Sequence, residues 1–505
     1  MIRWAPRLWH GERYRRQNRP ARIASVLTLL AAFVTVVLWT HSLLQFCGIA
    51  GGPDAEEEGD ITFTLHGDRH LNIAPLTTSV PQSLLTLAKA PETSSHSSTA
   101  GHRETFKEQP AKDGDWVSTD AYPRTKLKLF LYSAFLDSRL DEPVVRVIGA
   151  YASVGGAHVS CRLEYANGDV TVVAARRKTI NENWKLKYGA AFFTCPYLDD
   201  GSPPPSRVRL KETYELQWSP SIPVLPLKAR VGEKTGRMAV CVKPLHYDYD
   251  RATWLAEFIE FHRIVGADHF FFYNRSIGSN VERLLQVYKE QGIVSSRPWN
   301  LDIKSQKEIR TEGLFASLND CVYRCMHHFD YALVLDLDEF AVPRKDDTLL
   351  AMVSRINKDS APRTITSFVL LNSFFYLYWE NDTAAYGFPP ETGPAEIPYL
   401  LTQYKTRRSK KVFRVGSRSK YIVRPGHGSR GRHAMHRVSP EDALLHHYRI
   451  CEFGGFDCVR QPSLVDRSAL RFNSSLLERV NRVCAQAFPH LGGRCPRAPG
   501  LGNPW

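Results

Sequence analysis

Three carboxylates stand within four positions, at Asp336, Asp338 and Glu339, directly after the apolar run 331–335. Carboxylates this dense repel one another unless a cation balances them, and their oxygens suit Mg²⁺ or Mn²⁺. Because alternate residues of an extended segment share a side, we expect Asp336 and Asp338 to converge on one ion. A solvated acidic turn is the alternative, but the buried character of the preceding run favours a metal site.

A basic segment follows. Residues 405–437 contain twelve Lys or Arg residues, and no Asp or Glu stands between Glu396 and Glu441. Aromatic residues and glycines are interspersed, which indicates mobile loops over a site rather than a solvated charged face. Cations and a metal together stabilise a nucleoside diphosphate leaving group, so Lys411 and Arg414 are the candidate phosphate contacts.

Two adjacent histidines, His446 and His447, offer further metal ligands. A neutral imidazole from either residue could complete the metal shell. A buried structural histidine is an equally good interpretation of this spacing.

The elements that must position these residues alternate between strands and helices. The pattern predicts strands at 239–242, 269–274, 293–297 and 331–335, and helices at 253–265, 281–291 and 312–328. Such a series predicts a mainly parallel sheet covered by helices, within an α/β domain spanning 238–490. Ligands of such sheets bind at the carboxyl ends of the strands, where Asp336 stands.

Residues 126–232 have a different pattern, with short β-branched runs and the hairpin signal Asn167-Gly168. We predict a small β-rich accessory domain here, which a Cys161–Cys195 bridge could close. Residues 46–125 are rich in Ser, Thr, Pro and His, and they predict a disordered stem.

The N-terminus predicts a membrane anchor. Residues 23–45 are uncharged, and a span needs about 20 apolar residues. Arginines crowd the predicted cytoplasmic tail, 1–22, and acidic residues follow the anchor, so the positive-inside rule predicts a single-pass type II protein whose bulk is luminal. A cleaved signal peptide is the alternative, and it also sends the body into the secretory pathway.

The ten cysteines include no C-x₂-C pair of the kind that binds zinc, so disulfides are the better interpretation. Disulfides persist in oxidising compartments. Nine of them follow Cys47, so at least one is free or bridges two chains. The net charge of +14 is compatible with nucleic acid, but the anchor and luminal topology argue against that partner. The sequons at Asn274, Asn381 and Asn473 are each weak signals of glycosylation.

Several ordered segments resemble glycosyltransferase family 92. They are Val242-Lys243-Pro244-Leu245, residues 254–262 (WLAEFIEFH), residues 266–270 (GADHF), residues 336–340 (DLDEF) and His446-His447-Tyr448-Arg449. The resemblance covers roughly residues 238–484, about half of the chain.

The resemblance implies a GT-A fold, a Rossmann-like α/β domain, and an inverting transfer of galactose from UDP-galactose with Mn²⁺. It implies a Golgi membrane location, a glycan acceptor of the N-glycan or galactan kind, and metal and donor contacts for Asp336 and Asp338. It also assigns His446 or His447 to the metal. A glutamine expected near the Asn319 segment is Leu314 here, so the donor could be a different nucleotide sugar.

An inverting transfer needs a base for the acceptor hydroxyl. Glu380 and Asp382 follow the strand-like run 367–378 and stand beside Trp379, an aromatic suited to stacking on sugar. Surface carboxylates are the alternative for both, and the sequon at Asn381 favours Glu380. An inactive glycan-binding protein is the competing function, although intact Asp336 and Asp338 favour an enzyme.

Overall fold

The computed structural model describes residues 111–497, except for 122–125, 140–141, 181–182, 198–200, 214, 228–235, 327, 364, 395, 427–433 and 452–456. The predicted tail, membrane anchor and most of the stem therefore lie outside the described residues. The described end of the predicted stem is ordered instead, because Val117 and Ser118 pair with Leu131 and Phe130. No helix within the described part is long and apolar enough to cross a bilayer.

A seven-stranded sheet forms the centre of the α/β part, with the strand order β12-β11-β10-β13-β18-β15-β19. Its first four strands are mutually parallel, as predicted, whereas β18 runs antiparallel to both of its neighbours. The strands are β10 (Gly236–Val242), β11 (His269–Asn274), β12 (Val294–Pro298), β13 (Phe329–Leu335), β15 (Ile365–Leu370), β18 (Lys420–Val423) and β19 (Ala434–Arg437).

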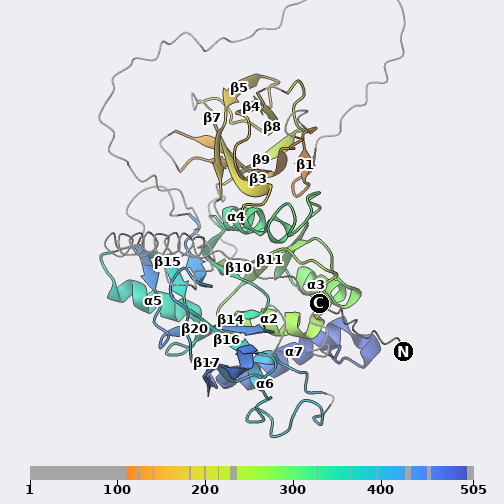
Figure 1. The fold of residues 1–505 in the computed structure, drawn as a ribbon, viewed down its shortest axis with the longest axis vertical. Helices are drawn as coiled ribbons and strands as arrows, with labels where there is room; N and C mark the ends of the chain where they lie inside the picture. The colour runs from red at the N-terminus through yellow and green to blue at the C-terminus, as the bar shows by residue number, and fades with distance from the viewer. Residues whose placement is uncertain are drawn as a thin grey trace, which may run out of the picture. The chain divides into compact units, whose positions relative to one another are not determined.

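Successive side chains along these strands point to opposite faces of the sheet, so the core has two layers. On β10, Val240 and Val242 face one hydrophobic cluster, whereas Ala239 and Cys241 face the other. Helices lie on both sides of the sheet (Figure 1). They are α2 (Ala252–Ile264), α3 (Ser279–Glu290), α5 (Leu349–Asp359) and α7 (Asn473–Ala487) in the first cluster, and α4 (Leu314–Cys325) in the second.

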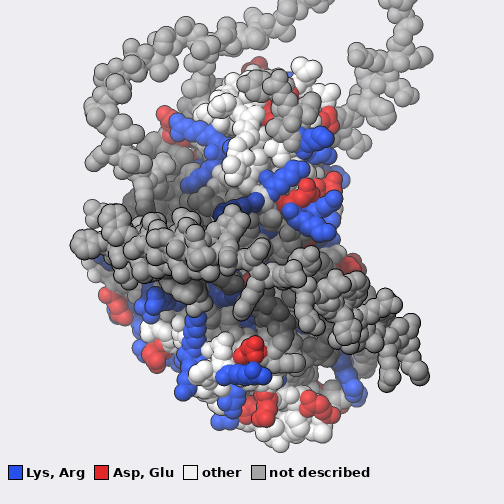
Figure 2. Space-filling view, in the orientation of Figure 1, with Lys and Arg blue, Asp and Glu red and all other residues white. Residues whose placement is uncertain are grey.

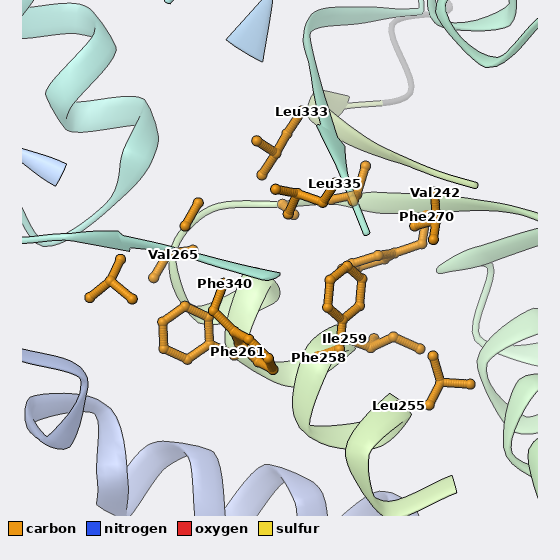
Figure 3. Close-up of a cluster of buried hydrophobic side chains, with 14 of the residues drawn as sticks. Val242, Leu255, Phe258, Ile259, Phe261, Val265, Phe270, Leu333, Leu335 and Phe340 are labelled. Carbon is orange, nitrogen blue, oxygen red and sulfur yellow. The ribbon is translucent and has the colours of Figure 1, made fainter. Parts of the chain in front are cut away.

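Helix α2 shows why the sequence packs in this way. Its apolar residues recur at helical spacing, so Phe258 reaches Phe270 of β11 and Phe261 reaches Phe340, at ring separations of 6.2 and 5.4 Å (Figure 3). Gly266 follows the helix with φ +110°, a conformation that glycine adopts readily.

A second, three-stranded sheet continues from the first. Its order is β14-β20-β16, with β14 (Glu339–Pro343), β20 (Ala443–Arg449) and β16 (Asn372–Tyr376). Two short strands, β17 (Arg407–Ser409) and β21 (Ser463–Val465), pair beside it, near the short helix α6 (Leu401–Tyr404). The run 367–378 therefore supplies parts of two strands in different sheets.

The N-terminal described region is β-rich, with nine strands in the order β5-β4-β8-β9-β2-β3-β7-β6, and β1 on β2. They are β1 (Val117–Ser118), β2 (Phe130–Asp137), β3 (Val144–Ala152), β4 (Val159–Glu164), β5 (Val170–Ala174), β6 (Arg176–Thr179), β7 (Tyr188–Pro196), β8 (Arg207–Glu212) and β9 (Ile222–Pro226). Phe135 and Phe192 of this β-rich part share a core with Tyr323 of α4.

The cysteines pair as disulfides. The bridges are Cys161–Cys195, Cys241–Cys321, Cys451–Cys458 and Cys484–Cys495. Cys325 is the free, buried cysteine of the described part, which agrees with the odd count after Cys47. Figure 2 shows Lys and Arg side chains beside Asp and Glu side chains over the described part of one face, so positive charge is not segregated there.

Candidate functional site

The acidic turn lies at the carboxyl end of β13, at the predicted edge of the sheet. The backbone N–H of Asp336 donates to Glu339 Oε2 at 2.9 Å, and the N–H of Glu339 donates to the Asp336 carbonyl at 3.1 Å. The Glu339 side chain is 1% exposed, whereas that of Asp338 is 43% exposed. Glu339 therefore shapes the turn, and Asp338 is open to a ligand.

Two lysines neutralise this turn. Lys420 Nζ lies 3.1 Å from Asp336 Oδ2 and 3.2 Å from Glu339 Oε2, and Lys243 Nζ lies 3.6 Å from Asp336 Oδ1. Burial raises the pKa of Asp336, but Lys243 and Lys420 outweigh burial and lower it. Burial lowers the pKa of Lys420, but Asp336 and Glu339 raise it above its ordinary value. Lys420 therefore stays charged.

His447 approaches the open carboxylate. Strand β20 pairs with β14 in a register that sets His447 opposite Glu339, which brings His447 Nε2 to 3.2 Å from Asp338 Oδ2. Burial raises the pKa of Asp338, but His447, Lys243 and Arg449 lower it well below its usual range. A separation of 3.2 Å suits two neighbouring ligands of one octahedral ion with bonds of about 2.1 Å.

His446 faces the other side of the same strand. It stacks on Phe375 at a ring separation of 4.1 Å and contacts Tyr448 and Ser468. Burial lowers the pKa of His446 to about 3. Since neighbouring residues of a strand point to opposite faces, only one of the two histidines can reach the turn, and the prediction of His446 as a metal ligand does not fit this position.

Asp336 and Asp338 do not converge on one site, although the sequence predicts that they bind the same ion. Within the part of the chain that is described, Asp336, Asp338 and His447 do not bring ligand atoms within 4.8 Å of one another as one set. Asp336 is held by lysines, while Asp338 is held by His447. The chemistry of the donor set therefore fits a cation at Asp338 and His447, with Asp336 balancing the lysines.

Asn372 of β16 contacts the ring nitrogen of His447 that faces away from Asp338. Its Nδ2 lies 3.1 Å from His447 Nδ1, and Glu339 Oε1 lies 3.4 Å from the same nitrogen. The Asn372 Oδ1 has no hydrogen-bond partner among the described residues. Turning the amide over would let Oδ1 accept from Nδ1–H, which leaves the Nε2 lone pair facing Asp338, as a metal ligand requires.

One cavity borders the turn, and a second lies at the end of β11. One, of about 180 Å³, is lined by Lys243, Asp336, Lys420 and Arg310. The other, of about 480 Å³, is lined by residues 274–277 at the end of β11. Thr311 also lines the first cavity, and residues 311–313 have three consecutive positive φ angles of 38°, 53° and 72°. Such strain at two non-glycine residues marks a segment that its surroundings hold in place.

The basic segment only partly meets its prediction. Lys411 lies over the Phe413 ring at 4.7 Å, Phe413 packs on Phe374 at 4.6 Å, and Phe374 contacts His447 at 5.3 Å. Lys411 is thus connected to the site through two aromatic rings. The described contacts of Arg414 are backbone ones, since its carbonyl accepts from Ser417 and Ser419.

Lys243 and Lys420 belong to the site, although the sequence motifs alone do not select either lysine. Lys243 follows the strand next to β13, and Lys420 begins β18 on its other side. The strand order of the folded sheet places a lysine on each side of β13, and the sequence does not give that order.

The candidate bases lie apart from these contacts. Asp382 pairs with Arg467 at 2.8 Å and accepts from Thr406 at 2.6 Å, and the Arg467 hydrogen bond lowers its pKa to about 2. A carboxylate so engaged is a poor base, so this prediction does not fit. Trp379 is 8% exposed and donates to the Val459 carbonyl, so it offers no open face for sugar. Glu380 is exposed.

Comparison with known proteins identifies the domain that carries this site. The sequence pattern of glycosyltransferase family 92 matches residues 236–482. Those residues form a glycosyltransferase family 92 domain. A family 92 protein of Caenorhabditis elegans, F13G3.3, is 26% identical over 121 residues, which cover 22% of this chain and 23% of the relative. The chain thus matches less than a quarter of that relative's length.

Solved structures have only a partial likeness to this chain. Staphylococcus aureus TarS 1–349 is 13% identical, with a TM-score of 0.22 over 37% of this chain and 47% of its own. Glucosyl-3-phosphoglycerate synthase from Mycobacterium tuberculosis, in a complex with Mn²⁺ and uridine diphosphate, is 11% identical, with a TM-score of 0.20 over 54% of this chain and 86% of its own. The family 92 match confirms the predicted enzyme class, a glycosyltransferase.

Proposed function

We propose that this chain transfers a hexose, galactose from UDP-galactose, onto a glycan acceptor, using a divalent cation and inverting the anomeric centre. The observation that carries the proposal is the Asp338–His447 pair beside Lys243 and Lys420, within a family 92 domain. The arrangement of β10–β13 supports a GT-A fold. The N-terminal sequence supports a type II membrane anchor, and the family resemblance supports a Golgi location.

The chain's own residues divide the work. Asp338 and His447 would hold Mn²⁺ or Mg²⁺, which when bound would neutralise the diphosphate charge. Lys243 and Lys420 line the 180 Å³ cavity and would contact phosphate oxygens. A base then removes the acceptor proton as the hydroxyl attacks the anomeric carbon from the opposite side. Glu380 remains the proposed base, because Asp382 is committed to Arg467.

Transfer from a panel of UDP-sugars, with Mn²⁺ and with EDTA, tests the proposal. Wild-type protein should consume UDP-galactose only with the cation, and Asp338→Ala should lose at least about a hundredfold in rate. Asp347→Ala is the matched control, because Asp347 is fully exposed in the same region. Consumption of no donor by the wild type, with glycan binding retained, would instead indicate an inactive glycan-binding protein.

A further inference from the structure

The loop between β6 and β7 of the β-rich part presents an open aromatic ring next to the candidate active site. Trp184 is 51% exposed, in contrast to the buried Trp299 and Trp379. Trp184 and Lys185 have positive φ angles of 52° and 56°, which are unfavourable for residues with a side chain. The loop therefore holds the ring outward at some cost in backbone strain.

The loop is anchored to the catalytic domain. The N–H of Tyr188 donates to the Glu308 carbonyl at 2.7 Å, and Lys187 Nζ lies 3.4 Å from Glu308 Oε1. Tyr188 also packs with Leu301 and Ile309 in one hydrophobic cluster. These contacts fix the position of Trp184 relative to the segment that leads into α4.

Arg310 joins this ring to the site. Its guanidinium carbon lies 4.1 Å from the centre of the Trp184 ring and 5.4 Å from that of Phe315. Arg310 also lines the same cavity as Lys243 and Asp336. One face of Trp184 is thus covered by Arg310 beside the cavity, and the residue is nevertheless 51% exposed.

We infer that Trp184 is an acceptor-binding platform, on which a neutral pyranose ring of the acceptor glycan stacks. The apolar C–H face of a pyranose suits an indole, and the neighbouring guanidinium can donate to hydroxyl groups. A charged donor suits the lysine-lined cavity better than this uncharged ring. The β-rich part would then supply acceptor recognition, an inference that rests on the proposed function of the same site.

Glycan binding and transfer kinetics of the full chain test the inference. The binding probe is an array of neutral N-glycans and β-galactan oligosaccharides. Trp184→Ala should raise the acceptor KM about tenfold and weaken array binding, with the donor KM unchanged. Trp184→Phe should recover part of the loss. Trp218→Ala is the matched control, because Trp218 lies under Lys211 at 4.8 Å elsewhere in the β-rich part.

The outcomes separate the two proposals. Asp338→Ala should abolish transfer yet keep array binding, so binding remains measurable even if the proposed reaction is wrong. An unchanged array signal in Trp184→Ala would overturn the platform. A rise in the donor KM, with the acceptor KM constant, would overturn it as well by assigning Trp184 to the donor.

Discussion

His447 Nε2 lies 3.2 Å from Asp338 Oδ2, although 109 positions separate the two residues. Strand pairing produces this contact, because Glu339 is opposite His447 and the N–H of Tyr448 donates to the Asp338 carbonyl at 2.8 Å. One imidazole nitrogen and one carboxylate oxygen held this close supply two ligands of a divalent cation site.

Replacing His447 should therefore weaken cation binding. We expect His447→Ala to reduce Mn²⁺ affinity by at least about tenfold, measured by electron paramagnetic resonance titration without any substrate. His446→Gln is the control, and it should keep the affinity while lowering the melting temperature, since His446 packs on Phe375. Equal losses in both variants would contradict the assignment of His447 alone.

Asn372 should act through the orientation of His447. Asn372→Ala removes the side chain 3.1 Å from His447 Nδ1, and comparable supporting residues contribute about 10–100-fold to metal affinity. The same Mn²⁺ titration measures the loss. Asn357→Ala, in α5 beside Tyr331, is the control and should leave the affinity unchanged. Wild-type affinity in Asn372→Ala would show that the imidazole does not need this amide.

Lys420 should stabilise the turn by its charge. Lys420→Met leaves Asp336 and Glu339 without their closest ammonium group, and removing one partner of a buried ion pair costs about 3–5 kcal/mol. Denaturant unfolding should show this loss. Saturating Mn²⁺ should then raise the melting temperature of the variant more than that of the wild type, because a cation at Asp338 adds positive charge to the same acidic turn. An equal shift in both proteins would be evidence against this balance of charges.

Asp382 should matter for stability rather than for catalysis. Its pKa is depressed to about 2, so its stabilising contribution is present above the ordinary pKa of 3.8 and is lost as pH falls toward 2. Because Arg467 is 56% exposed, we expect Asp382→Asn to cost only about 1 kcal/mol at pH 7. The difference from wild type should vanish near pH 2, and kcat should stay the same. A hundredfold fall in kcat would restore Asp382 as the base.

The Cys241–Cys321 bridge should stabilise the junction of β10 and α4. Replacing both cysteines with serine should cost about 2–4 kcal/mol in denaturant unfolding. Cys325 is the internal control. Burial raises the pKa of its thiol, so iodoacetamide should leave it unmodified in the folded protein, as mass spectrometry would show. Rapid alkylation of Cys325 would indicate that this junction opens in solution.

The sequence by itself determined the local elements. Strand β11 has the predicted bounds, and α2 begins and ends within one residue of its prediction, because apolar spacing is a local property. The acidic turn after β13 was equally readable, since five apolar residues precede it directly. The odd cysteine also followed from counting.

The tertiary structure decided which side chains meet. Adjacent residues His446 and His447 look equivalent in sequence, and only the pairing of β20 with β14 and β16 sends one to Asp338 and the other into the core. Lys420 became a partner of Asp336 because β18 pairs with β13, a contact across 84 positions. Asp382 meets Arg467 across 85 positions, in a contact that only the tertiary structure makes. Long-range strand register sets such distances, and no local pattern in the chain encodes it.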